Sequence, residues 1–173
     1  MEVVHPYAIR IVGDPVLRQR ANEVTDIDGK LAVIVDGMTG ALHEAHGLAV
    51  AAPQVGVLKR VFVYQLPEEE ERRVIINPVI SESEGEWIYD EGCLSVPGLS
   101  WEIVRPKSVH LTGLDLDGNE VSLEADELLA RMFQHELDHL DGVLLLDRIP
   151  EDQRKEAKRA VRELQLQRAD GLI

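Results

Sequence analysis

Residues 125–142 read ADELLARMFQHELDHLDG, and this stretch predicts the helix around which the rest of the fold is arranged. Its apolar residues recur every three to four positions, which indicates an amphipathic helix over about 125–141. Gly142 follows where a glycine commonly ends a helix. At 100° per residue, an apolar arc of about 200° contains Leu128, Leu129, Met132, Phe133, Leu137 and Leu140. Glu136 lies in the middle of that arc, and the polar remainder holds Arg131, Gln134, Asp138 and Asp141.

The same helix carries an HExxH sequence over residues 135–139. His135 and His139 lie about 40° apart on the helix, so their imidazoles can converge on one metal ion. A pair of ordinary core histidines would leave Glu136 unexplained, because an unpaired carboxylate on an apolar face costs at least several kcal/mol. A metal or catalytic role accounts for all three residues, and the pattern therefore predicts a metal-dependent catalytic site.

A catalytic metal usually takes three protein ligands and leaves one position for water. Leu145 stands where the extended pattern HExxHxxGxxH needs a third histidine, which excludes that ligand set. Glu156 or Glu163 could supply a carboxylate, as in a metallopeptidase, although their helix has the pattern of an exposed one. Cys93 is the better candidate, because the glycines and proline of residues 91–98 (EGCLSVPG) indicate the irregular backbone of a site loop. Both ligand sets remain open on spacing alone.

The other elements predict an α+β fold with a mainly antiparallel sheet, because helix, strands and two helices follow one another without βαβ alternation. A first helix is expected between Asp28 and His46, with Gly47 as its cap. A last helix is expected from Glu151 to Arg168, with Ala157, Val161 and Leu164 on one face. Strands are expected over 61–66, 74–80, 107–114 and 119–123, with a charged loop at 68–73 and a tight hairpin turn at Asp117-Gly118. We expect one domain over residues 1–173, since no repeat or linker divides the chain.

Charge and cysteine content narrow the functional classes. The 32 acidic and 18 basic residues give a net charge of −14, which repels nucleic acid and anionic lipid, so neither DNA nor a membrane is an expected partner. The single cysteine cannot form an internal disulfide, and Met1–Pro6 lacks a basic region followed by an apolar stretch. We therefore expect a cytoplasmic protein.

Three separated segments carry a resemblance to a known family. Residues 47–54 (GLAVAAPQ) are similar to the pattern GxGxAAxQ, residues 91–95 match EGCLS, and residues 134–139 match QHExDH. In this order the three motifs resemble those of the peptide deformylases, the metal hydrolases that remove the N-formyl group from nascent bacterial and organellar proteins. The resemblance implies a peptide-deformylase-like fold, in which mainly antiparallel sheets pack around the central HExxH helix and a C-terminal helix follows.

The resemblance also implies a role for each matching residue. Cys93, His135 and His139 are expected to ligate the metal, with water in the fourth position. Glu136 is expected to act as general base and acid, and the Gln54 amide and the Leu94 N–H are expected to stabilise the oxyanion. The main-chain groups expected to bind the substrate peptide belong to Gly47, Leu48, Ala49 and Gly92.

Further expectations concern the surroundings of the site. Glu91 and Arg105 resemble a family ion pair that braces the cysteine loop, with Asp138 in an outer hydrogen-bond shell. Ala49 departs from the family's glycine, and the departure would be costly only if that position needs a positive φ. The resemblance favours Fe(II) as the physiological ion, with Zn(II) or another divalent metal in isolated protein.

The expected partners are N-formyl-methionyl nascent polypeptides. Residues 151–168 carry six basic and four acidic residues, and the resemblance suggests that this helix docks on the ribosome. The alternatives are an HExxH metallopeptidase with a carboxylate as third ligand and a non-catalytic metal-binding relative.

Overall fold

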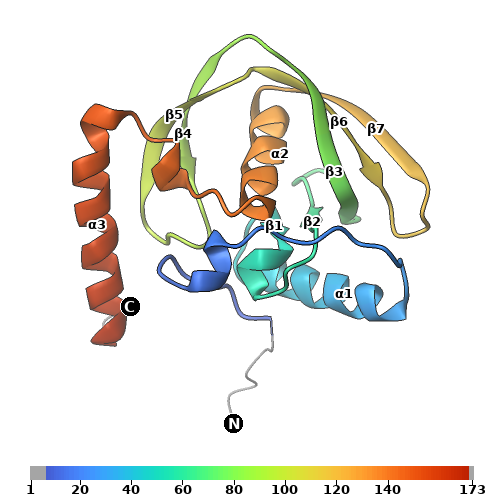
Figure 1. The fold of residues 1–173 in the computed structure, drawn as a ribbon, viewed down its shortest axis with the longest axis horizontal. Coiled ribbons are helices and arrows are strands. Elements are labelled where there is room, and N and C mark those ends of the chain that lie inside the picture. Colours follow the sequence, from blue (N-terminus) through green and yellow to red (C-terminus); the bar gives the residue numbers. More distant parts are fainter. Residues whose placement is uncertain (1–6, 172–173) are drawn as a thin grey trace.

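Figure 1 shows the computed structural model, which describes residues 7–171, so the expectation for Met1–Pro6 lies outside the described residues. The helices are α1 (Gly29–Glu44), α2 (Glu127–Leu140) and α3 (Glu151–Ala169), and the short 3-10 helices are η1 (Pro15–Arg18), η2 (Ala52–Val55) and η3 (Leu145–Asp147). The strands are β1 (Ala49–Ala51), β2 (Val61–Tyr64), β3 (Arg73–Glu84), β4 (Trp87–Gly92), β5 (Ser100–Arg105), β6 (Ser108–Leu114) and β7 (Glu120–Asp126).

The strands form two sheets, one of five strands in the order β1-β2-β3-β6-β7 and one of two strands, β4 and β5. Every neighbouring pair of these strands is antiparallel, which confirms the predicted α+β class. In Figure 1, α2 runs through the middle of the molecule, between the β4–β5 hairpin and the larger sheet, and α3 stands at one edge. The central HExxH helix and the C-terminal helix are therefore both present.

Strand β2 is buried on both faces, because helices cover the sheet from two sides. Val61 and Val63 join the hydrophobic cluster that contains Leu31, Val35, Met38 and Leu42 of α1. Phe62 and Tyr64 point the other way, into the cluster that contains Phe133 and Leu140 of α2. This alternation fixes α2 on the sheet with its apolar face inward.

Helix α3 packs along the edge of the fold through the three residues expected on its apolar face. Ala157, Val161 and Leu164 are all buried. Val161 and Leu164 join Val12, Leu17 and Val96 in a third hydrophobic cluster. Within the described residues, no helix combines the length and the apolar character that crossing a bilayer requires.

The caps of α1 show one difference from the prediction. The Asp28 side chain accepts the Leu31 N–H at the start, as an N-cap does. At the end, the left-handed residue is His46 (φ 53°) and not Gly47. Gly47 is the next residue, and its N–H donates to the Leu42 carbonyl, so it satisfies one of the free carbonyl groups at the end of α1.

The hairpin between β6 and β7 also differs from the expected two-residue turn. Gly118 has φ 79°, but Asp117 is not left-handed. The turn is longer because the Asp115 side chain accepts the N–H groups of Asp117 and Asn119. The Asp115 N–H then donates to the Asn119 carbonyl and closes the loop.

The sequence patterns missed three strands, β1, β4 and β5, and misplaced some boundaries. Strand β3 begins at Arg73, inside the expected charged loop, and continues to Glu84, whereas β2 ends at Tyr64. The segment before Cys93 is strand β4, so the irregular backbone begins only at the cysteine. Arg131, which the helix pattern groups with the polar residues of α2, is only 2% exposed and pairs with Glu91 in the interior.

Candidate metal centre

The structure brings the thiol of Cys93 and the imidazoles of His135 and His139 together. The ligand atoms of these residues all lie within 4.8 Å of one another, and the described residues contain no other group of three His, Cys, Asp or Glu side chains so arranged. The Cys93 Sγ lies 3.3 Å from His139 Nε2, which lies 3.1 Å from His135 Nε2. Neither Glu156 nor Glu163 of α3 belongs to the group.

The donor set fits a divalent metal ion. One soft sulfur and two imidazole nitrogens suit Zn(II) or Fe(II) better than a hard cation such as Mg(II). Burial alone would raise the pKa of Cys93, but the rings of His139 and His135 outweigh it and hold the pKa of the thiol well below its usual range. The cluster therefore favours a positive charge at its centre, and either a proton or a metal ion can carry that charge.

Glu91 orients His135 from the side opposite the cluster. Its Oε1 lies 2.6 Å from His135 Nδ1, so Nδ1 carries the proton and Nε2 is left to face the cluster. Arg105 donates to the same carboxylate through Nε at 2.9 Å and Nη2 at 2.8 Å. The predicted Glu91–Arg105 ion pair is thus present, and it is bidentate.

The ionised state of Glu91 follows from these contacts. Burial would raise the pKa of this carboxyl, but hydrogen bonds from His135 and Arg105 reverse the effect and hold it well below the ordinary range. Arg105 also donates from Nη1 to Asp138 at 2.8 Å, and Arg148 holds Asp138 through Nη2 at 2.7 Å. A chain of charged groups therefore leads from His135 toward the surface.

Glu136 is only 3% exposed, and its Oε2 is buried without a hydrogen-bond partner among the described residues. Burial raises the pKa of this carboxyl, whereas His135 and His139 oppose the shift. A buried carboxylate oxygen with no protein donor is suited to bind a proton or a water molecule. It lines the same cavity as His135.

Gln54 reaches the cluster from η2. Its Oε1 accepts the Ala51 N–H at 2.9 Å, which fixes the amide orientation and directs Nε2 inward. The Nε2 lies 3.1 Å from Ser95 Oγ and 3.6 Å from Cys93 Sγ. An N–H donor is therefore held beside the sulfur.

A cavity of about 850 Å³ opens onto the cluster. The predicted site residues that line it are Gly47, Leu48, Ala49, Gln54, Gly92, Cys93, Leu94, His135 and Glu136, while His139 is not among its lining residues. Ala49 lies in the extended strand β1 and has no positive φ, so its methyl group introduces no backbone strain. A Cβ at Gly47 would lie 2.8 Å from Leu94 Cδ1, so a side chain there would displace Leu94.

Sequence reasoning missed Ser95, Tyr89 and Arg131, which lie at or beside the cavity. The Ser95 hydroxyl accepts from Gln54, and Tyr89 and Arg131 line the cavity wall. A signal for Arg131 existed, since a residue four positions before His135 falls only about 40° from it on the helix. Nothing in the pattern of residues 87–90 distinguishes Tyr89 from an ordinary surface aromatic.

Comparison with known proteins agrees with this geometry. The family model described as polypeptide deformylase matches residues 6–155. A peptide deformylase of Halothermothrix orenii is 46% identical over 141 residues, 82% of this chain and 92% of the relative.

Two solved structures have the same fold. The peptide deformylase of Legionella pneumophila has a TM-score of 0.87 and 35% identity over 93% of this chain and 96% of that one. The Synechococcus elongatus peptide deformylase, solved in complex with actinonin, has a TM-score of 0.85 and 39% identity over 94% and 87% of the two chains. The chain belongs to the polypeptide deformylase family.

Proposed function

We propose that this deformylase removes the formyl group from the N-terminal formyl-methionine of newly made polypeptides at a metal ion held by Cys93, His135 and His139. The observation that carries the proposal is the convergence of one sulfur and two imidazole nitrogens within 4.8 Å, at the wall of a cavity of about 850 Å³. A divalent ion held here would act as a Lewis acid: it would lower the pKa of a bound water molecule and polarise the formyl group.

Glu136 moves the protons of the reaction. Its buried carboxylate accepts a proton from the attacking water as the water oxygen bonds to the formyl carbon. It then delivers that proton to the amide nitrogen as the carbon–nitrogen bond breaks. The second proton of the water stays on the new carboxyl group, so the products are formic acid, which ionises to formate, and a polypeptide with a free N-terminal amine. Atoms and protons balance with water as the only co-reactant.

Two donors face the oxygen on which negative charge develops. The Gln54 Nε2 is held inward by the bond from Ala51 to its Oε1, and the N–H of Leu94 follows directly after Cys93. Donors that are fixed before the reaction lose no free energy in reorienting during it.

The substrate main chain is received by the free edge of β1. This strand pairs with β2 on one side only, so Gly47, Leu48 and Ala49 can offer backbone groups to an extended peptide. Gly92, at the end of β4, lines the same cavity. Backbone recognition suits an enzyme whose substrates share only their first residue.

Fe(II) is the physiological ion in this proposal, and Zn(II) or another divalent metal can occupy the site in isolated protein. Zinc binds such ligands more tightly than ferrous iron, so the ion present depends on availability during isolation. Protein isolated without oxygen is expected to contain iron by elemental analysis. Equal activity of the Zn(II) and Fe(II) forms would contradict the preference.

The cytoplasm is the proposed compartment, because a thiolate ligand and a ferrous ion both require reducing conditions. Residues 1–173 are proposed to form one domain, since the third hydrophobic cluster joins Val12 and Leu17, near the start of the chain, to Val161 and Leu164 of α3. A single cooperative thermal transition of the metal-loaded protein is the expected result.

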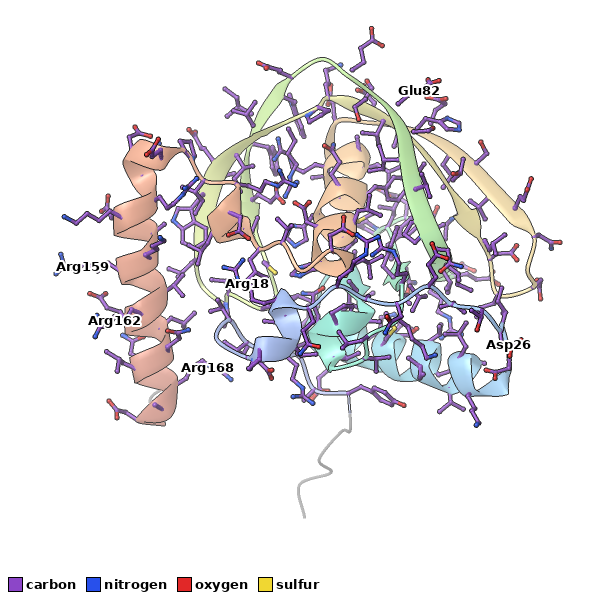
Figure 2. All side chains as sticks on the ribbon, viewed as in Figure 1. Arg18, Asp26, Glu82, Arg159, Arg162 and Arg168 are labelled. Atoms are coloured by element: carbon purple, nitrogen blue, oxygen red, sulfur yellow. The ribbon has the colours of Figure 1, made fainter. Side chains whose placement is uncertain are left out.

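Ribosome docking through residues 151–168 is proposed from the charge of α3. Figure 2 shows Arg159 and Arg162 on the side of α3 that faces away from the rest of the protein. Replacing both by glutamate is expected to reduce co-sedimentation with ribosomes, whereas Glu82→Lys on the opposite side of the molecule is not. Unchanged co-sedimentation of the arginine variant would contradict docking.

Formate release from a formyl-methionyl peptide tests the main proposal. Cys93→Ala is expected to lose both the metal and the activity, whereas Glu136→Gln is expected to keep the metal and lose the activity. Metal content unchanged by Cys93→Ala would favour a carboxylate ligand and the metallopeptidase alternative. Full activity of Glu136→Gln would overturn the role given to this residue.

A further inference from the structure

Arg131 is a buried arginine beside the metal centre that none of the proposed reaction steps uses. It lies one helical turn before His135 on α2. Its Nη1 donates to Oε2 of Glu91 at 2.6 Å, and its Nη2 donates to the Trp87 carbonyl. A guanidinium removed from water needs such partners, because its desolvation otherwise costs several kcal/mol.

Arg131 completes the hydrogen bonding of the Glu91 carboxylate. Oε1 accepts from Arg105 Nη2 and His135 Nδ1, and Oε2 accepts from Arg105 Nε and Arg131 Nη1. Each oxygen has two lone pairs, so the four donors fill both oxygens. Without Arg131, Oε2 keeps a single donor and the carboxylate is held mainly by the Arg105 fork.

Arg131 also attaches β4 to α2 at a second point. Trp87 and Tyr89 stack with ring centroids 4.9 Å apart, and the guanidinium carbon lies 5.4 Å and 5.8 Å from the two rings. The strand that leads into Cys93 is therefore joined to the histidine-bearing helix both at Trp87 and at Glu91. Cation–π contacts of this kind contribute about 0.5–2 kcal/mol.

We propose that Arg131 is a positioning residue of the metal centre. It holds Glu91 and Trp87 so that Cys93 stays close enough to His135 and His139 to bind the same metal ion. The inference rests on the proposed function, because it takes these three side chains as the metal ligands. The positive charge of Arg131 acts in the opposite direction, because it repels a metal ion nearby and so lowers the metal affinity of the site. Its ion pair with Glu91 offsets that charge, so the positioning effect is expected to be the larger.

The first test measures Zn(II) affinity by competition with a chromophoric chelator. Arg131→Met keeps an apolar stem and removes all the donors, and we expect it to bind Zn(II) about 10- to 100-fold more weakly than the unmodified protein. Arg131→Lys keeps the charge and one donor, and its affinity is expected to fall between the two. If the methionine variant does not fold, the lysine variant still gives a result, because unchanged affinity in it contradicts the need for the two-point contact.

The matched control is Arg60→Met. Arg60 is 7% exposed and contacts the other end of α2, where it binds the Leu140 carbonyl at 3.0 Å and Asp141 at 2.9 Å. This variant is expected to lower the thermal stability and to leave the Zn(II) affinity as it is. The comparison separates a general loss of stability from a loss of positioning.

A double-variant cycle tests whether Arg131 acts through Glu91. Arg131→Met is expected to cost less Zn(II) affinity in the Glu91→Gln background than in the unmodified protein, because the contact with the carboxylate is already lost there and only the contact with Trp87 remains. Additive losses would show that Arg131 does not act through the carboxylate. The Co(II) forms provide a second readout, since a displaced sulfur weakens the thiolate-to-metal absorption band.

Two results for Arg131→Met would overturn the inference. Unchanged Zn(II) affinity with a lowered melting temperature would show a purely structural arginine. Tighter binding would show that its charge outweighs its positioning. Cys93→Ala distinguishes these from a failure of the proposed function, because an unaltered affinity in that variant would mean that the sulfur is not a ligand at all.

Discussion

Glu91 Oε1 lies 2.6 Å from His135 Nδ1, and this contact joins the strand before Cys93 to the helix that carries both histidines. Only Gly92 separates Glu91 from Cys93 along the chain, so one side chain fixes parts of the site that are far apart in sequence. Metal ligands that are oriented in this way lose less conformational freedom when the ion binds.

Glu136→Gln is expected to separate catalysis from metal binding. The amide has the same shape as the carboxyl but cannot accept the proton of water, so kcat is expected to fall by about 10²- to 10⁴-fold. Metal content by elemental analysis is expected to match that of the unmodified protein. Loss of metal in this variant would mean that Glu136 supports the ligands instead of moving protons.

Gln54→Ala is expected to lower kcat by about 10²- to 10³-fold with little change in KM, because the lost donor acts on the developing oxyanion. Gln153→Ala, at an exposed position of α3, serves as the control and is expected to behave as the unmodified protein. Steady-state kinetics on a formyl-methionyl peptide make the comparison. An effect confined to KM would indicate that Gln54 binds the substrate without favouring the transition state.

Acid stability is expected to depend on Glu91. Its pKa is lower in the folded protein than its ordinary value near 4.5, because the contacts with His135 and Arg105 outweigh burial. The stabilisation from this group is therefore present above about pH 4.5 and is lost as the pH falls toward the lowered value. Urea unfolding of the metal-free protein below pH 5 is expected to show a shallower pH dependence in Glu91→Gln. Identical pH profiles would exclude Glu91 as a source of acid sensitivity.

Two glycines predict opposite effects of the same substitution. Gly142 ends α2 with φ 74°, and a Cβ there would lie 2.6 Å from the Arg18 carbonyl oxygen, so Gly142→Ala is expected to destabilise by about 1–3 kcal/mol. Gly40 lies within α1 with open space around it, so Gly40→Ala is expected to stabilise by about 0.4–1 kcal/mol. Chemical denaturation of both variants tests the pair. Equal effects of the same sign would contradict this account of the Gly142 turn.

The helices and the metal ligands could be predicted because their signals are local. The HExxH spacing places His135 and His139 on one side of α2 by helix geometry alone. Cys93 could be suggested from its glycine-rich surroundings, but nothing in the sequence measures how close a residue 42 positions away lies to His135. That proximity depends on ion pairs between β4, β5 and α2.

Other features depend on tertiary contacts and had no reliable local pattern. The helix pattern groups Arg131 with the polar residues of α2, but Glu91 pairs this arginine in the interior, which no local pattern shows. Strand β1 has only three residues, too few to show alternation. The Asp117-Gly118 dipeptide predicts a tight turn, but the Asp115 side chain binds the backbone N–H groups of Asp117 and Asn119 and makes the loop longer.

An unpaired strand edge invites other chains of the same protein to add to it, which is a common route to aggregation. The edge that β1 leaves open is three residues long, so a second copy could form only a few backbone hydrogen bonds there. Three residues are enough to bind the N-terminus of a substrate for a short time. They are too few for a stable intermolecular sheet between copies of this protein. The short length of this edge therefore favours brief binding of a substrate terminus over pairing with a second copy of the chain.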